Sequence, residues 1–213
     1  MPLINMQRST SRINYLLLIA AVMLNGCATT ATQPTSSNSL KPSVLHKQHM
    51  DKIANIQSFS LNGRIGVITN PKNYSARLAW QHNAENDFVD VFSPLGGKVA
   101  NIVKTPDQVT LTDNKDKVVI AKDTEALTKE TLGFELPLSG LSHWSLGKPS
   151  NEGIVNAVTW DENGRINSLQ QNGWNIHYKD YAAYGEYFLP NKVVLKNDQI
   201  TIKLVVDKWA EFK

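Results

Sequence analysis

The stretch FSLNGRIGVITNPKNYSARLAW, residues 59 to 80, decides the fold class. Apolar and polar residues alternate at both of its ends, and this period of two is the pattern of β-strands that bury one face. Two neighbouring strands with apolar inner faces are therefore expected here. The inner faces are predicted to carry Phe59, Leu61, Ile65 and Val67 from the first strand and Tyr74, Ala76, Leu78 and Trp80 from the second.

Further short strands follow on the C-terminal side of this stretch. DFVDVF and KVANIVK flank the turn at residues 93–97, and QVTLT and KVVIA are separated by DNKD, so each pair is predicted to form a hairpin. The first half of the domain is therefore expected to be a meander of about six strands. Strands are also predicted near the C-terminus, within residues 154–160, 165–171, 174–181, 192–196 and 199–206.

Three helices are predicted, one before the strands and two between the two groups of strands. They span residues 43–56, 123–133 and 139–147, and each begins near a residue that can cap a helix. The predicted caps are Ser43, Asp123 or Thr124, and Ser139, and the second and third helices are expected to end at Gly133 and Gly147.

The order strands, helices, strands, with hairpins throughout, indicates a mainly β fold with some α-helix. The architecture that fits best is one strongly curved antiparallel sheet with helices packed on its concave side. With 213 residues, 41% hydrophobic and 19% charged, the chain has the composition of one packed domain.

The N-terminus carries an export signal. Arg8 and Arg12 precede the apolar run at residues 13–24, and small residues follow, which is the pattern of a secretory signal peptide over residues 1–26. The run is shorter than the roughly 20 apolar residues of a transmembrane helix. Without these two arginines the net charge falls from +3 to +1, so neither a basic surface for nucleic acid nor a nucleic-acid partner is expected.

Cys27 is the only cysteine, so it can form neither an internal disulfide nor a cysteine metal site. LNGC, residues 24–27, resembles the lipobox of bacterial lipoproteins, in which the cysteine is lipidated; the alternative is an incidental cysteine beside an ordinary cleavage site. Ala28 after it matches release to the outer membrane. Residues 27–42 are predicted to be the lipidated cysteine and a flexible tether, and residues 43–213 the folded domain.

No arrangement of residues predicts catalysis. The histidines at 46, 49, 82, 143 and 177 are scattered, no metal-binding motif includes them, and no nucleotide-binding glycine motif occurs. An enzyme, a metal site and a cofactor other than covalent lipid are therefore not expected. Any transport by this protein has to run downhill without ATP.

The five tryptophans leave two interpretations open. They lie at or beside predicted strands and helices, where a filled core would place them, but the same residues could line an apolar cavity under a curved sheet. The sequence alone does not separate these interpretations.

Seven short segments of the sequence carry a family resemblance. They are FSLNGRIGV (59–67), YSARLAW (74–80), SPLGG (93–97), LPLSGLSHWSLG (136–147), QNGWNIHY (171–178), LPNKVVL (189–195) and ITIKLVVDKW (200–209). In this order, which covers nearly the whole mature chain, they resemble the family of outer-membrane lipoproteins called LolB. This resemblance implies an incomplete antiparallel β-barrel closed by helices around an apolar cavity. It also implies a receptor that accepts acylated lipoproteins from the periplasmic carrier LolA and places them in the outer membrane.

The resemblance assigns roles to individual residues. Cys27 corresponds to the lipidated anchor, and Leu95, flanked by Pro94 and Gly96, to the apolar tip of a loop that acts in membrane insertion. Lipoprotein cargo, a LolA-type carrier and outer-membrane lipids are the implied partners of a chain expected to be a monomer. The candidates for the cavity lining are Trp80, Trp144, Trp174 and Trp209, whereas Trp160 is assigned to the core.

The turn that carries Leu95 also has a physical interpretation. Ser, Pro and Gly at the first, second and fourth positions suit a type I turn, which puts Leu95 at the third position with its side chain outward. Two other functions remain open. One is a soluble carrier of similar fold, and the other is an acyl-chain-binding or scaffold lipoprotein with the same fold.

Overall fold

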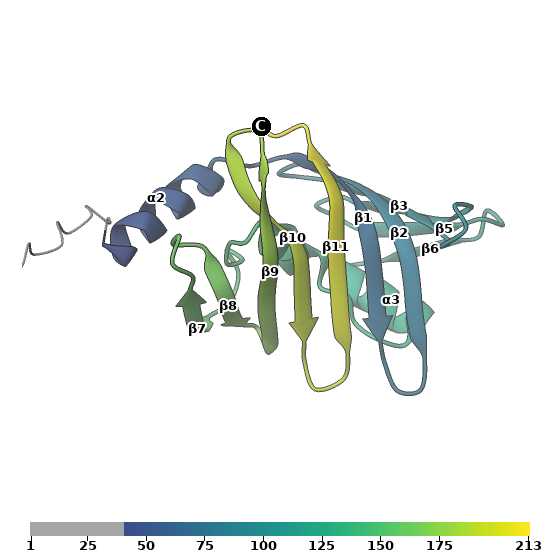
Figure 1. Cartoon of the computed structure of the whole chain (residues 1–213). Helices are drawn as coiled ribbons and strands as arrows, with labels where there is room; N and C mark the ends of the chain where they lie inside the picture. The colour runs from purple at the N-terminus through teal and green to yellow at the C-terminus, as the bar shows by residue number, and fades with distance from the viewer. Residues whose placement is uncertain (1–40) are drawn as a thin grey trace, which may run out of the picture. The chain divides into compact units, whose positions relative to one another are not determined.

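A computed structural model describes residues 41–213, and the predicted signal peptide, Cys27 and most of the predicted tether lie outside the described residues. All eleven strands of this region belong to one antiparallel sheet that does not close, in the order β6-β5-β4-β3-β2-β1-β11-β10-β9-β8-β7. Figure 1 shows the sheet with helix α3 behind β1 and β2. The predicted fold class, an open curved antiparallel sheet with short helices, is confirmed.

The first six strands form the predicted meander, in which each strand pairs with the next along the chain. Alternating residues enter the core: Leu61, Leu78 and Val89 are buried, whereas Asn62, Arg77 and Phe88 face outward and are exposed. The strands are β1 (Phe59–Ile68), β2 (Asn73–His82), β3 (Asp87–Phe92), β4 (Lys98–Lys104), β5 (Val109–Asp113) and β6 (Val118–Ala121).

The remaining strands continue the sheet from the other side of β1. Strand β11 pairs with β1, so the last strand of the chain lies beside the first and joins the two groups of strands. The observed strands extend past several predicted ends because β9, β10 and β11 are long hairpin partners. They are β7 (Val155–Trp160), β8 (Ile166–Gln171), β9 (Trp174–Tyr184), β10 (Tyr187–Lys196) and β11 (Thr201–Ala210).

The helices are α2 (Pro42–Ala54), α3 (Thr124–Leu132) and α4 (Leu138–Ser145). The Asp123 side chain caps α3 as predicted, accepting a hydrogen bond from the Ala126 N–H at 2.8 Å. The predicted caps Ser43 and Ser139 are wrong. Proline occupies the first turn of α2 and the residue preceding α4, so both helices begin one residue earlier and have no side-chain cap.

Among residues 41–213, no helix combines the length and the apolar character needed to cross a lipid bilayer.

Candidate functional site

An apolar cavity of about 290 Å³ lies between the inner face of β1–β5 and the helical segment that contains α3 and α4. Only four of its twenty lining residues carry side-chain oxygen atoms, namely Tyr74, Ser75, Thr124 and Thr128. The Thr128 hydroxyl is already used, since it donates to the Thr124 carbonyl and accepts from the Leu136 N–H, both at 2.8 Å. The other lining residues are Ile65, Val67, Ala76, Leu78, Trp80, Val89, Val91, Val99, Ala100, Ile102, Leu111, Leu132, Phe134, Leu136, Leu138 and Leu141.

The exposure of the lining residues locates the mouth of the cavity. Along β2, Leu78 and Trp80 are buried but Tyr74 and Ala76 are only half-buried, so exposure rises toward the start of the strand. Strand β3 shows the same trend from buried Val89 to half-buried Val91. The cavity therefore opens at the end where β3 turns into β4.

Tyr74 crosses this mouth from the sheet to the helical side. Its ring lies 5.6 Å from the ring of Phe134, and its hydroxyl donates a hydrogen bond of 3.4 Å to the Leu132 carbonyl at the end of α3. A hydrogen bond of this length between exposed groups is weak. The contact between β2 and α3 at the mouth is therefore easily broken.

The loop between β3 and β4 projects beside the mouth. The Gly96 N–H donates to the Ser93 carbonyl at 2.9 Å, and the Ser93 N–H donates to the Gly97 carbonyl at 2.8 Å. Gly96 has φ +99°, a left-handed conformation that suits glycine. The Leu95 side chain is 99% exposed, so its predicted place at the tip of the turn, pointing outward, is confirmed.

Trp80 lines the cavity and ties its deep end to a buried carboxylate. Its indole N–H donates to Asp87 Oδ1 at 2.8 Å, and Asp87 is only 2% exposed. The same oxygen lies 2.7 Å from His82 Nδ1, and Lys104 Nζ lies 3.7 Å from the other carboxylate oxygen. This network holds the Trp80 ring in place between β2 and β3.

The other three tryptophans named as cavity candidates lie outside this lining. Trp144 and Trp174 face each other with ring centres 6.4 Å apart, and the Trp144 N–H donates to Gln171 at 2.9 Å. A Cβ at Gly140 would come within 2.6 Å of the Trp144 ring, so glycine there lets the ring lie on its own helix. Trp209 packs edge-on against Phe59 with ring centres 5.0 Å apart.

Trp160, assigned to the core, is half-buried at the core margin, with its ring centre 3.3 Å from that of His46. The residues of α3 that line the cavity were not predicted from the sequence. Thr124, Thr128 and Leu132 are spaced by four residues and so share one face of α3, and this spacing is the signal that could have identified them.

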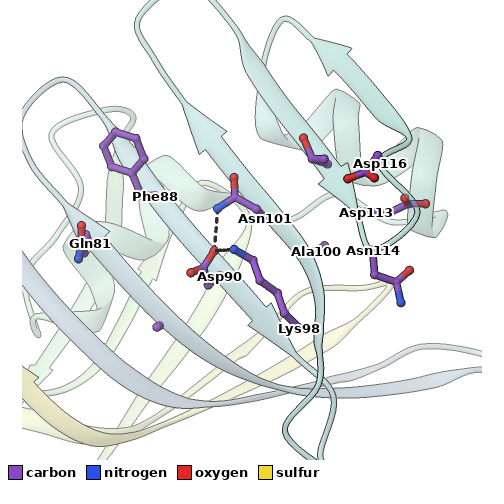
Figure 2. A pocket seen from close by; sticks show the side chains of 11 residues that line it. Gln81, Phe88, Asp90, Lys98, Ala100, Asn101, Asp113, Asn114 and Asp116 are labelled. Atoms are coloured by element: carbon purple, nitrogen blue, oxygen red, sulfur yellow. Dashed lines mark hydrogen bonds and ion pairs between the residues drawn. The ribbon is translucent and has the colours of Figure 1, made fainter.

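Two larger hollows of about 670 Å³ each have linings that mix polar and apolar residues. One lies on the outer face of β2–β5, where Figure 2 shows Lys98 and Asn101 pointing toward Asp90. The hydrogen bond from Lys98 is the main cause that lowers the pKa of Asp90. The other lies beside α4, where burial lowers the pKa of both His143 and Lys148. Neither lining resembles that of the apolar cavity.

Comparison with known proteins places these features in a family. The family model described as outer membrane lipoprotein LolB matches residues 57–209. The chain belongs to the LolB family. An outer-membrane lipoprotein LolB from Thiobacillus denitrificans is 35% identical, covering 87% of this chain and 91% of the relative. Another LolB from Nitrosococcus oceani is 30% identical over 91% of this chain and 95% of the relative.

A solved structure supports the fold independently. A putative outer membrane lipoprotein-sorting protein domain from Vibrio parahaemolyticus superposes with a TM-score of 0.53 at 9% identity, covering 81% of this chain and 94% of that one. At this identity the likeness concerns the fold alone. Membership of the LolB family makes the chain an outer-membrane lipoprotein and confirms the resemblance found in the sequence.

Proposed function

We propose that this chain is a receptor anchored to the outer membrane, which accepts acylated lipoproteins from a LolA-type periplasmic carrier and delivers them into the membrane without ATP. The observation that carries the proposal is the apolar cavity that opens beside the exposed tip at Leu95. Membership of the LolB family supports it. A scaffold lipoprotein would need no such cavity, so the receptor is favoured over that alternative.

The cavity suits acyl chains rather than a particular protein. Transfer of each CH₂ group out of water is worth about 0.8 kcal/mol, so the chains of a lipoprotein have to pass from one apolar environment to another. A lining with few polar groups gives affinity without demanding a specific shape. Cargo then moves in one direction only if this chain binds the acyl chains more tightly than the carrier does, and if the membrane holds them more tightly still.

The described cavity has to widen to hold several acyl chains. At about 290 Å³ it is at the lower end of ligand pockets, which span about 300–1,000 Å³. The weak contact of Tyr74 with Leu132 makes the end of α3 the part that moves outward most easily. No step in this process needs a catalytic residue or a cofactor beyond covalent lipid on Cys27.

Leu95 is assigned to delivery rather than to anchoring. Burying one leucine gains only about 1.5–3 kcal/mol, which is too little to hold a domain at a membrane. The acyl groups on Cys27 would provide the anchor. The tip could still enter the bilayer surface and bring the neighbouring mouth to it.

The test is a two-step transfer assay with Leu95→Glu. Cargo uptake from the loaded carrier is expected to be unchanged, whereas delivery into liposomes falls roughly tenfold or more, because a charge replaces the apolar tip. Ile154→Glu is the matched control, since Ile154 is also apolar and 76% exposed but lies at the far edge of the sheet. Normal delivery by Leu95→Glu would contradict the assignment.

A second test concerns the anchor. A chain with Cys27→Ala is expected to stay soluble, folded and able to take cargo from the carrier, because the cavity is built within residues 65–141. Circular dichroism and cargo binding measure this outcome. Loss of folding on this change would contradict the assignment of residues 27–42 as a tether.

A further inference from the structure

A row of cations crosses the outer face of the sheet. The strand registers place Lys179 opposite Lys192, and Lys192 opposite Val205. Val205 is also opposite Arg64, which lies opposite Arg77. Paired residues of antiparallel strands point to the same face, so the four cations from β9, β10, β1 and β2 lie in one line. Their neighbours along the strands point inward and are buried, for example Tyr178, Val193 and Leu78.

More basic residues lie on this face toward the end that carries the cavity mouth. Lys203 sits opposite Gly66 and Val194, one row nearer that end, and Lys196 follows in the next row. Arg64 pairs with Asp207 at 2.8 Å. In the part of the chain that the structure describes, no carboxylate lies within ion-pair distance of the other exposed cations of this group, which are Arg77, Lys179, Lys192, Lys196 and Lys203.

This arrangement works against the stability of the isolated fold. Like charges directly opposite each other on neighbouring strands are destabilising, and Lys179 with Lys192 is such a pair. Arg64 with Arg77 is a second pair, in which Asp207 compensates the charge of Arg64. An external anionic surface would relieve this repulsion. At the usual spacing between strands, the row from β9 to β2 is roughly 20 Å long, which is more than a single small anion can span.

The row leads to the loop that carries Leu95. Arg77 is opposite Phe92, and Phe92 is opposite Lys98, which forms an ion pair with Asp90 at 2.6 Å. The loop at residues 93–97 therefore begins directly beside the end of the row at Arg77. A hollow of about 320 Å³ lies at this point on the outer face. Its lining combines cations with an apolar floor: Arg64, Arg77 and Lys203 surround it together with Ile65, Gly66, Ser75, Ala76, Pro94 and Val205.

We infer that this basic face binds the anionic phospholipid headgroups of the membrane surface and thereby orients the cavity mouth toward the bilayer. The inference rests on the proposed function. A lipid surface presents anionic headgroups directly above an apolar acyl layer. The basic row matches the headgroups, and the apolar tip at Leu95 beside it matches the acyl layer. In Figure 1 the strands that carry the row lie side by side in the middle of the sheet.

The direct test is lysine footprinting of the full mature chain anchored in vesicles through its own lipid. A membrane-impermeant amine reagent is applied on vesicles of phosphatidylcholine alone and on vesicles that also contain phosphatidylglycerol. Labelling of Lys192 and Lys203 is expected to fall by roughly fivefold on the anionic vesicles and to recover in high salt. Labelling of Lys47 and Lys52 on α2 should not change.

A charge-reversal pair tests the consequence for delivery. The unchanged protein is expected to deliver cargo faster into anionic vesicles than into vesicles of phosphatidylcholine alone. The double variant Lys192→Glu, Lys203→Glu is expected to keep cargo uptake but to deliver into both kinds of vesicle at the same rate. Lys208→Glu, Lys213→Glu is the matched control, because it changes the net charge equally while both lysines are exposed at the other end of the sheet. An equal loss in the control would overturn the inference.

The two proposals fail in distinguishable ways. Equal labelling on both kinds of vesicle, in a preparation that still delivers cargo, overturns the inference and leaves the receptor function intact. Protection of the row by the carrier alone, without anionic lipid, also overturns it and identifies the face as a protein-docking surface. Absence of cargo uptake under every condition removes the proposed function itself, and with it the basis of the inference.

Discussion

The inner face of the sheet is mostly apolar, yet its two halves are filled differently. Beneath β8–β11 the side chains of Ile176, Val193 and Leu204 are 0% exposed and form a solid core. Beneath β2–β5, Val91 and Leu111 are only half-buried and border the cavity. The two halves therefore differ although their strands carry similar apolar side chains: the β8–β11 half forms a packed core, and the β2–β5 half borders the cavity.

The difference comes from the side chains that face the sheet from the helical layer. Over the packed half, Trp144 projects from α4 against Trp174 and the Gln171 side chain. Over the hollow half, α3 presents the short side chains of Thr124 and Thr128, and larger residues of the helical segment such as Leu132, Phe134 and Leu141 border the space beside them. Short side chains leave a void that the strands cannot fill, because strand residues are held by the sheet. The facing layer therefore decides whether an apolar sheet face becomes core or cavity.

The sharpest test of this comparison is one substitution made in each half. Leu204→Ala is expected to lower the free energy of unfolding by about 3 kcal/mol, because it opens a void in a packed core. Leu111→Ala removes the same atoms beside an existing cavity and should cost about 1 kcal/mol or less. Urea denaturation of both variants measures the difference. Equal losses would show that the two halves are packed alike.

The buried carboxylate at the deep end of the cavity gives the next largest effect. Asp87→Asn is expected to lower the free energy of unfolding by about 1–3 kcal/mol, because the buried carboxylate accepts the Trp80 N–H and contacts His82. Asp90→Asn, on the outer face of the same strand, should change it by less than about 1 kcal/mol. A larger loss for Asp90→Asn would mean that the outer face of β3 contributes more to stability than the buried Asp87 network.

Filling the apolar cavity should lower its affinity for an acyl chain far more than it lowers the stability of the fold. Ala76→Phe places a ring in the cavity and is expected to reduce the binding of a fluorescent fatty acid roughly tenfold, with little loss of stability because the space is already empty. The control is Ala79→Phe, which adds the same ring on the outer face, where Ala79 lines the mixed hollow of Figure 2. Unchanged binding by Ala76→Phe would place the acyl-chain site elsewhere.

The smallest expected effect is a pH dependence at the margin of the packed half. Burial, with the nearby Arg165 charge, lowers the pKa of His49 from 6.5 to about 4. The unfolded chain therefore binds more protons between these values, so stability is complete above pH 6.5 and falls as the pH drops toward 4. Since His49 is partly exposed to solvent, which screens the effect, the expected loss is about 1 kcal/mol.

Denaturation at pH 7.5 and pH 5 measures this loss. His49→Phe should reduce the difference between the two pH values. A residual difference is expected, because burial also lowers the pKa of His143. A difference that His49→Phe leaves untouched would assign the pH dependence to other groups.

Local patterns were enough to predict most of the elements. The period-two alternation in β1 and β2 and the Asp123 cap of α3 are properties of short segments, and the structure confirms them. The predicted Ser43 and Ser139 caps are wrong because Pro42 is the first residue of α2 and Pro137 directly precedes α4. Leu95 could be placed at the exposed tip because a type I turn needs only four residues to specify it.

The sequence by itself determined the strand pattern, the exposed turn and, through the order of its phrases, the family. Tertiary structure alone decided that Trp80 lines a cavity while Trp144, Trp174 and Trp209 lie outside that lining, because the distinction depends on which helix faces which strand. It also decided that cations from β9, β10, β1 and β2 meet in one row. Their charges are nearly cancelled in the net balance, and only the pairing of strands distant in the chain brings them together.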